Sequence, residues 1–525
     1  MADALAGVSF RETPQTEMAR DDQVQNNAGG YGFAVDDWMR ATRFLILGTD
    51  GGTYYVGESD LTRDNARVIQ RLAETDGVKL VDLLIDVSEA GRAPRQNPTL
   101  FALASCCASP DPATRRAAFA ALPRIARTGT HLFTFARYVE QFRGWGRGLR
   151  RAVADWYTTK APDALAYQAV KYRQREGWSH RDLLRLSHPE TSDPAHRALL
   201  SWIALKPEGP MPLIVSGYEK AQNVSTAKEW AALVSEYGLP WEALPDAAMN
   251  EAEVWEALLP HTGITALIRQ LGRLSNIGLI APLGGKTNEI AARIADGEEL
   301  LKGRVHPLAV LVALATYAQG HGFRGSNTWI VAPKIVEALN EAFYLAFDAV
   351  APANKRTLVA LDVSGSMLDG CVANSPLPPF QAEAALAMVA LRTEPSVFPM
   401  AFSSGFVNLP LTPSQRLDDV LRVMSRMPFE RTDCAVPMLW ALREKVPVDT
   451  FVIYTDSETW AGTVHPFQAL KMYRDAMGIA ARLVVVGMTS TGFTIADPSD
   501  AGMLDVVGMD TATPNLISAF ARGDL

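Results

Sequence analysis

The chain has 525 residues, too many for one hydrophobic core, which predicts two to four domains or a long repeat array joined to a globular unit. Its formal net charge of −8 disfavours nucleic-acid binding only as an average, because charge can be segregated along a chain. Four cysteines without paired spacing exclude a disulfide framework and a thiolate zinc site, and they favour a reducing, intracellular setting.

The first 30 residues are polar and are expected to form a flexible N-terminal segment. They contain acidic residues early and no apolar stretch long enough for a secretory signal. The longest apolar run of the chain, residues 307–318, is well short of the roughly 20 residues that a membrane-spanning helix needs. We therefore expect a cytoplasmic protein that has no membrane partner.

Residues 31–352 form one amphipathic segment after another, with apolar residues at i, i+3, i+4 and i+7 and capping signals between them. One helix is expected over 163–175 and another over 286–301, and no convincing strand interrupts the series. Consecutive pairs are spaced like the two-helix repeats of HEAT or armadillo proteins, although no repeat consensus is visible. The prediction is an all-α helical-repeat module, which would curve and present long surfaces.

Positive charge is concentrated within this module. Residues 115–185 contain 15 Lys and Arg against 5 Asp and Glu, a local balance of +10 that leaves about −18 for the rest. The stretch is a candidate phosphate-binding surface. An equally good interpretation from composition alone is that the arginines solvate the outer faces of helices.

Three residues in and after the basic stretch are the best candidates for RNA contacts. Lys171 and Arg175 are four residues apart on the helix predicted for 163–175, so both cations would point to one place and match phosphates of an RNA backbone. His188, at the end of the next predicted helix, could donate a hydrogen bond or stack on a base. Alternatively it is a helix-terminal histidine held by nearby carbonyls.

The pattern changes at residue 353. Short apolar runs rich in β-branched residues at 357–363, 396–402, 449–456 and 481–488 alternate with amphipathic segments at 381–392, 414–424, 435–444 and 466–477. This alternation predicts a doubly wound α/β domain with a parallel sheet. The chain is therefore divided into a flexible segment (1–30), a helical-repeat module (31–352) and an α/β domain (353–525).

The first predicted strand ends in a candidate metal site. Asp362, Ser364 and Ser366 present three oxygens from one tight turn, at the sheet edge where ligands gather in such domains. Thr432 and Asp456 follow later in the order expected of the metal-ion-dependent adhesion site of von Willebrand A-type domains, which the region resembles. The alternative, that Asp362 and the serines only cap a helix, explains neither Thr432 nor Asp456. The expected cofactor is a divalent cation, Mg²⁺ in the first place, with Mn²⁺ or Ca²⁺ as alternatives.

The sequence contains no convincing catalytic set. Residues 284–287 resemble the end of a phosphate-binding P-loop, but Ile280 stands where the first glycine is required. Ser364 stands where an aspartyl-phosphate enzyme has its second carboxylate. We therefore expect that the protein is not an enzyme.

Motifs along nearly the whole chain resemble the Ro autoantigen family, the TROVE-domain RNA-binding proteins. The matching strings are GTDGGTYYVGE, THLFTF, WGRGLRRAVADWY, KYRQREGWSHRDLLRLSH, HGFRG, LDVSGSM, TDCAVPM, YTDSETWAGTVHP and GMTSTGFTIADP. The sequence departs from the family pattern at Glu430 and Arg431, where small glycines are typical.

The resemblance implies a monomeric ring of HEAT-like repeats whose ends are joined by the A-type domain. Y RNA would bind the outer surface, with Lys171, Arg175 and His188 at the family's positions, and misfolded non-coding RNAs would thread a single-stranded 3′ end through the central hole. It also implies roles in small-RNA stability, RNA quality control and the stress response. In bacterial relatives a 3′-to-5′ exoribonuclease, polynucleotide phosphorylase, is tethered through Y RNA.

Two other functions are compatible with the sequence. In the first, the protein is an interaction scaffold whose metal site binds the carboxylate of an unknown protein ligand. In the second, more remote one, it is a metal-dependent hydrolase.

Overall fold

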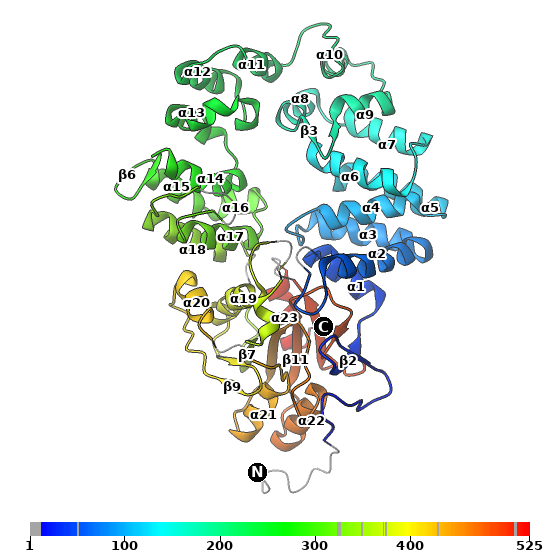
Figure 1. The fold of residues 1–525 in the computed structure, drawn as a ribbon, viewed down its shortest axis with the longest axis vertical. Coiled ribbons are helices and arrows are strands. Elements are labelled where there is room, and N and C mark those ends of the chain that lie inside the picture. The colour runs from blue at the N-terminus through cyan, green and yellow to red at the C-terminus, as the bar shows by residue number, and fades with distance from the viewer. Residues whose placement is uncertain are drawn as a thin grey trace.

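The computed structural model describes residues 12–49, 52–322, 327–347, 350–370, 372, 375–427, 430–508 and 512–524. Its helices follow one another around a ring, which an α/β domain closes at the base in Figure 1. The domain boundary predicted near residue 352 lies between the last ring helix and the first strand of the large sheet. None of the helices described in these ranges is long and apolar enough to cross a membrane.

The ring helices carry the numbers α1 to α18. They are α1 (Asp37–Leu47), α2 (Glu58–Thr75), α3 (Gly77–Glu89), α4 (Asn97–Ala108), α5 (Pro112–Ile125), α6 (Gly129–Phe142), α7 (Arg147–Thr158), α8 (Pro162–Lys171), α9 (His180–Ser187), α10 (Pro194–Ile203), α11 (Leu213–Ala221), α12 (Ala227–Tyr237), α13 (Ala252–Leu258), α14 (Ile264–Asn276), α15 (Thr287–Ile294), α16 (Gly297–Lys302), α17 (Pro307–Ala318) and α18 (Pro333–Leu345).

The first half of the ring has two layers of helices, as HEAT-like repeats require. Helices α3, α5, α7 and α9 contact one another in succession, and α2, α4 and α6 do the same beside them. In Figure 1, α5, α7 and α9 lie on the outer side of the ring. The expected capping signals are confirmed, because Asp111 and Asp193 accept hydrogen bonds from backbone N–H groups just after Pro112 and Pro194. These caps fix where α5 and α10 begin.

Two predicted helices are wrong in extent. The helix expected over 163–175 ends at Lys171, because Glu176 and Gly177 adopt positive φ and turn the chain into a hairpin of β3 (Gln174–Arg175) and β4 (Trp178–Ser179). The helix expected over 286–301 is divided into α15 and α16, because Asp296 caps a new helix. The two glycines of the segment that resembles the end of a phosphate-binding loop belong instead to a second small hairpin, in which β5 (Ile280–Ala281) pairs with β6 (Gly284–Gly285).

The α/β domain, called the A-type domain below, contains a sheet of six strands in the order β13-β11-β10-β7-β8-β9. All neighbours are parallel except β8 and β9, which are antiparallel. The strands are β7 (Thr357–Asp362), β8 (Val397–Phe402), β9 (Phe406–Val407), β10 (Thr450–Thr455), β11 (Arg482–Gly487) and β13 (Met503–Val507). Its helices are α19 (Pro379–Thr393), α20 (Leu417–Met424), α21 (Val436–Arg443), α22 (Pro466–Met477) and α23 (Thr513–Arg522).

Helices cover both faces of this sheet, as predicted. Along β7, Leu358 and Ala360 belong to the apolar cluster that includes α21 and α22, whereas Val359 and Leu361 belong to the cluster that includes α19. Successive residues of a strand point to opposite faces, so this division follows from the register of β7. Every residue of β7 and β10 is buried, which explains their continuous apolar sequence.

The N-terminal segment differs from the expectation of flexibility. Residues 1–11 lie outside the described residues, but residues 12–34, which we call the N-terminal arm, pack against the A-type domain. The arm forms β1 (Gln23–Gln25) and β2 (Tyr31–Ala34), and β2 pairs with β12 (Phe493–Thr494) of the A-type domain. Its polar composition was misleading, because Gln15, Gln23 and Asn26 are buried and hydrogen-bonded.

Both ends of the ring contact the A-type domain of the same chain. At the first end, Arg43 of α1 forms a buried ion pair with Asp505 of β13. At the other, the Asn340 side chain of α18 accepts a hydrogen bond from the backbone N–H of Leu417, at 2.8 Å. A single chain therefore closes the ring.

Candidate functional site

The candidate metal ligands of the first strand converge as predicted. Asp362 is the last residue of β7, and one of its carboxylate oxygens accepts a hydrogen bond from the Ser364 backbone N–H at 2.9 Å. The Ser364 and Ser366 hydroxyls lie 3.1 Å apart in the turn that follows. The turn is fixed from the side by Gly365, whose N–H donates to the Glu430 carbonyl at 2.9 Å. Three oxygen donors therefore face one small region.

Asp456 and Thr432 are brought to the same sheet edge by two further loops. Asp456 follows β10, the neighbour of β7, and accepts a hydrogen bond from the Ser366 side chain. The carbonyl of Thr432 accepts from the backbone N–H groups of Trp460 and Ala461, at 3.1 and 3.0 Å, which joins the Thr432 loop to the Asp456 loop. All five predicted ligands are buried.

Three buried carboxyl groups, those of Asp362, Glu383 and Asp456, lie close together at this site. Burial and the charge of Asp456 raise the pKa of Asp362, and burial also raises that of Asp456. Glu383 of α19, completely buried, accepts from the Asp362 backbone N–H at 3.2 Å, and burial raises the pKa of its carboxyl as well. No arginine or lysine in the described ranges forms an ion pair with any of these carboxylates. The charge would be compensated by a cation or by protons.

The donor set contains two carboxylates and three hydroxyls, a combination that suits a small hard cation. Among the described residues there is no group of three or more His, Cys, Asp or Glu side chains arranged to hold a metal ion. Binding of a cation would therefore depend on the hydroxyls of Ser364, Ser366 and Thr432.

The surroundings of the site include residues that the sequence did not single out. Tyr55, from the loop between α1 and α2 of the ring, lies near Asp456 and Glu458, since burial and these two charges raise the pKa of its phenol to about 12. The Trp460 side chain is hydrogen-bonded to Tyr55, and the Arg431 guanidinium lies 5.3 Å from the Trp460 ring centre. A ring residue thus contributes to the edge of an A-domain site, which no local pattern could indicate.

The three predicted RNA contacts lie on one connection, between the end of α8 and the end of α9. Lys171 is half-buried, 3.7 Å from Glu242 and 5.4 Å from the ring centres of Tyr167 and Tyr172. Arg175 is not on the helix with Lys171, contrary to the prediction, but stands exposed on β3. His188, exposed at the C-terminus of α9, has positive φ. The geometric argument from i, i+4 spacing is therefore wrong.

The basic stretch offers a second group of cations on the outer helices. Several of its arginines already have partners within the protein. Arg124 forms an ion pair with Glu89, Arg137 forms one with Glu176, and Arg143 donates a hydrogen bond to the Cys107 carbonyl. A further group is exposed and has no ion-pair partner among the residues that the structure describes. It consists of Arg116 on α5, Arg147 and Arg151 on α7, and Arg185 on α9. Because α5, α7 and α9 are neighbours, these charges lie along one layer of the ring.

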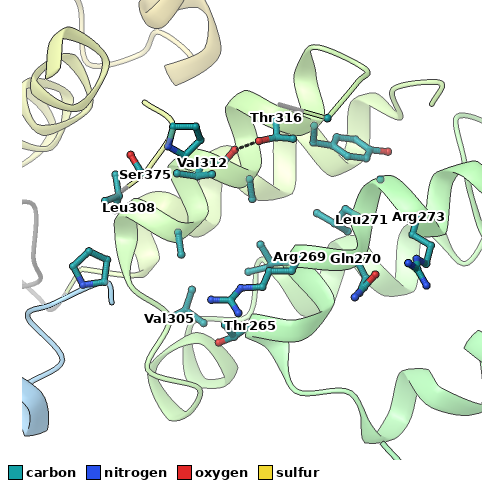
Figure 2. Close-up of a pocket in the computed structure, with 18 of the residues that line it drawn as sticks. Thr265, Arg269, Gln270, Leu271, Arg273, Val305, Leu308, Val312, Thr316 and Ser375 are labelled. Carbon is teal, nitrogen blue, oxygen red and sulfur yellow. Dashed lines mark hydrogen bonds between the residues drawn. The ribbon is translucent and has the colours of Figure 1, made fainter. Parts of the chain in front are cut away.

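A cavity of about 660 Å³ lies where the two ends of the ring meet the A-type domain. It is lined by α14 and α17, by residues 94 and 95 after α3, and by residues 375 and 376 of the A-type domain. Figure 2 shows Arg269 and Arg273 on the α14 side and Thr316 on α17, where its hydroxyl donates to the Val312 carbonyl. The sequence analysis did not select this region, because its arginines come from a helix with an ordinary amphipathic pattern.

This cavity carries positive charge. Arg95, Arg269 and Arg273 line it, and no acidic residue is among its described lining residues. Arg269 and Arg273 are exposed, four residues apart on α14, and neither forms an ion pair within the described part of the chain. Trp329, also in the lining, stacks against Tyr317 with ring centres 5.9 Å apart. Cations beside an aromatic surface are suited to a phosphate and a base.

Comparison with known proteins gives matches along the whole chain. The TROVE domain model matches residues 24–208 and 236–317, and the Ro60 vWA domain model matches residues 356–521. The chain is 45% identical to the RNA-binding protein RO60 of Deinococcus radiodurans, over 100% of both proteins. It is 35% identical to the RNA-binding protein RO60 of Caenorhabditis elegans, over 97% of this chain and 92% of that protein.

The fold agrees with a solved structure. The crystal structure of the Deinococcus radiodurans RO (RSR) protein superposes with a TM-score of 0.72 at 45% identity, and the match covers 93% of this chain and 100% of that one. Helical ring, A-type domain and sequence are therefore similar together, and the chain belongs to the Ro60 family, the proteins that combine a TROVE domain with a Ro60 vWA domain.

Proposed function

We propose that this protein binds RNA and is not an enzyme. The observation that carries the proposal is the row of exposed, unpaired arginines on the outer layer within the described part of the chain, Arg116, Arg147, Arg151 and Arg185. Unpaired cations on neighbouring helices attract a phosphate backbone, whereas arginines that only solvate a helix need no such alignment. Both curated relatives are named as RNA-binding proteins, which supports the same function and disfavours catalysis.

The outer surface would bind structured RNA of the Y RNA kind. Lys171 and Arg175 lie at the connection between α8 and α9, His188 follows α9, and α9 contacts α7 of the outer arginine row. Arg175 and His188 are exposed and available for phosphate or base contacts, whereas the Lys171 ammonium already forms an ion pair with Glu242. We infer that Arg175 and the arginines of α7 contribute more to the affinity than Lys171 does.

The positively charged cavity would receive the single-stranded 3′ end of a misfolded non-coding RNA. It lies between both ends of the ring and the A-type domain, so a strand that enters the ring would pass close to it. Arg269 and Arg273 would bind successive phosphates, and Trp329 would offer a ring for stacking. Recognition of an unpaired end agrees with proposed roles in RNA quality control, small-RNA stability and the stress response.

The A-type domain would hold a divalent cation, Mg²⁺ before Mn²⁺ or Ca²⁺. Asp362, Ser364, Ser366, Thr432 and Asp456 fit such an ion, because buried carboxylates without a cationic side chain are costly and hydroxyl oxygens complete the set. When bound, the ion would offer a position for an oxygen ligand from a partner. The exoribonuclease expected as a partner, polynucleotide phosphorylase, would instead be tethered through RNA.

We also infer that the ring works as a monomer in the cytoplasm. One chain supplies both ring ends and the domain that joins them, so closure of the ring requires no second copy.

The test uses the intact protein and two RNAs that share one hairpin, of which only one has a single-stranded 3′ tail. The wild type is expected to bind both, and the tailed RNA more tightly. The Arg269→Ala/Arg273→Ala variant should lose the preference for the tail and keep affinity for the hairpin. Arg124→Ala is the matched control, because Glu89 already neutralises that arginine. Equal loss of both RNAs in the Arg269/Arg273 variant, or no loss of either, would contradict the division into an inner and an outer site.

A protein-interaction scaffold acting through the metal site is the second candidate function, favoured by the buried donor set. It predicts that Asp362→Asn abolishes Mn²⁺ binding and releases a protein partner while RNA affinity is unchanged. Loss of RNA affinity in the same variant would count against a separate scaffold role.

A further inference from the structure

The N-terminal arm packs against the two loops that carry Thr432 and Asp456, which we call the ligand loops. Residues 12–23 of this arm precede the region matched by the TROVE model and lie outside the region matched by the Ro60 vWA model. Nevertheless the arm is buried against the A-type domain, and its side chains are hydrogen-bonded to residues more than 400 positions away. Such contacts need a structural reason.

Gln15 makes the central contacts. Its side chain is fully buried, and its amide nitrogen donates to the Asp433 carboxylate at 2.7 Å and to the Val464 carbonyl at 2.8 Å. Its amide oxygen accepts from the Thr459 hydroxyl at 2.6 Å and from the Gly462 N–H at 3.2 Å. Both donors and both acceptor sites of the amide are therefore used, which is the full capacity of a glutamine.

These partners belong to the two ligand loops. Asp433 follows Thr432 directly, and Thr459 comes three residues after Asp456. The Thr459 hydroxyl also accepts from the Cys434 N–H at 3.0 Å, so Gln15 and Thr459 together link one loop to the other. The Asp433 carboxylate, in turn, accepts from the Ala435 N–H at 2.9 Å, just before α21 begins.

Residues 26–28 of the arm form further hydrogen bonds with the loop that carries Asp456. The Asn26 side chain donates to the Thr459 carbonyl at 2.8 Å. The Asn27 side chain and the Ala28 N–H donate to the two carboxylate oxygens of Glu458, at 2.7 and 3.0 Å. There is no space between arm and loop at Gly30, where an added Cβ would lie 1.9 Å from the Thr459 carbonyl oxygen.

We propose that Gln15 is a positioning residue for the metal site, and that the N-terminal arm sets the distance between Thr432 and Asp456. The proposal rests on the metal site of the proposed function. Gln15 touches neither predicted ligand. It bonds to Asp433, the neighbour of Thr432, and to Thr459, three residues after Asp456, and so supports the ligands one step farther out than their direct hydrogen-bond partners do. A site that relies on hydroxyls and few carboxylates depends strongly on such positioning, because each oxygen contributes little unless all converge.

The experiment measures Mn²⁺ affinity of the full chain by electron paramagnetic resonance of the free ion, in wild type, Gln15→Ala and Gln23→Ala. Gln23 is the matched control, a buried glutamine of the same arm that bonds to the arm's own backbone and to His465, the last residue before α22, but not to Asp433 or Thr459. We expect Gln15→Ala to weaken Mn²⁺ binding roughly tenfold, the lower end of the effect of removing a direct hydrogen-bond partner of a metal ligand. Gln23→Ala should change it less than twofold.

A second readout does not depend on the metal. Amide hydrogen exchange of residues 430–434 and 456–462 should accelerate in Gln15→Ala and remain at the wild-type rate in Gln23→Ala. Asn27→Ala, an exposed position where only the hydrogen bond to Glu458 is removed, should accelerate exchange in 456–462 alone and serves if Gln15→Ala does not fold.

The outcomes separate the two claims. A wild type that binds no Mn²⁺ contradicts the proposed metal site, and hydrogen exchange then decides the positioning role by itself. A wild type that binds Mn²⁺ with equal affinity to Gln15→Ala, or equal effects of the Gln15 and Gln23 substitutions in both measurements, overturns the positioning role.

Discussion

Arg43 of the first ring helix forms an ion pair with both carboxylate oxygens of Asp505, which lies on the last strand of the large sheet. One guanidinium nitrogen lies 2.8 and 2.6 Å from the two Asp505 oxygens, and the other donates to the Thr491 and Phe493 carbonyls at 2.9 and 2.8 Å. The Arg43 side chain is 1% exposed. The pair therefore joins ring and A-type domain inside the protein.

We expect Asp505→Ala to destabilise the protein by about 3–5 kcal/mol, because it leaves a buried guanidinium without its counter-charge. Thermal unfolding measures this loss, and small-angle scattering measures whether the ring opens. Asp37→Ala is the control. Both carboxylate oxygens of Asp37 also bind an arginine, Arg71, but this pair lies on the surface, where it contributes at most about 1 kcal/mol. Equal effects of the two substitutions would contradict a special role for the buried pair.

The α7 arginines should control the salt dependence of RNA binding. Arg147→Ala/Arg151→Ala is expected to weaken hairpin binding and to lower the slope of log Kd against log salt by roughly 0.7–0.9 for each phosphate that is no longer bound. Filter binding over a series of KCl concentrations measures the slope. A weaker affinity with an unchanged slope would mean that these arginines act through the fold and not through phosphates.

Removing a negative charge beside Lys171 should strengthen RNA binding. Glu242 lies 3.7 Å from the Lys171 ammonium and competes with phosphate for it. Burial raises the pKa of Glu242, but Lys171 opposes the shift. Glu242→Gln is therefore expected to tighten hairpin binding about two- to threefold at low salt, an effect that corresponds to a partly exposed ion pair. Fluorescence anisotropy measures it, with Glu236→Gln on the neighbouring helix α12 as control. No change would place Lys171 outside the RNA site.

Stability should fall in mild acid because His180 is buried as a neutral side chain. Burial lowers its pKa to about 4, from 6.5, and its Nδ1 lies 2.8 Å from the Tyr157 hydroxyl. A depressed pKa means that the unfolded chain binds the proton first, so stability is complete above pH 6.5 and is lost as the pH falls toward 4. The loss amounts to about 3 kcal/mol at most.

The Tm difference between wild type and His180→Gln measures this contribution. It should be large at about pH 7.5 and shrink at about pH 4.5, because the variant lacks the His180 imidazole, whereas other buried histidines such as His131 are present in both proteins. The exposed His188→Gln variant should follow the wild type at every pH. A Tm difference that stays constant with pH would exclude His180 as the source of acid sensitivity.

The convergence of the candidate metal ligands could be predicted from the sequence because their geometry is local to strand ends. Asp362 and Asp456 end neighbouring parallel strands, and the carboxyl ends of such strands meet at one edge of the sheet. Gln15 and Tyr55 could not be predicted in this way. They reach the same edge only through the tertiary path of the chain, and neither stands in a pattern that differs from ordinary polar or aromatic sequence.

The basic stretch of the candidate RNA surface could be found from composition, but its geometry could not be predicted. A count of charges located the basic stretch, whereas the assignment of Arg175 to a helix failed at the positive φ of Glu176 and Gly177. The availability of each arginine depends on a distant acid such as Glu89, so Arg147 and Arg151 could be told from Arg124 only in three dimensions.

The pairing of β2 with β12 has a consequence for biosynthesis. Phe33 lies beside Thr494, its partner in the sheet, so the arm must wait for residues made about 460 positions later. At a typical synthesis rate of about 5–20 residues per second this delay is roughly 25–90 s. During that interval β2 can pair only with β1, and the two ends of the ring cannot be joined because the A-type domain is incomplete. Any RNA bound by the helical repeats at that stage would be enclosed when the last domain emerges from the ribosome.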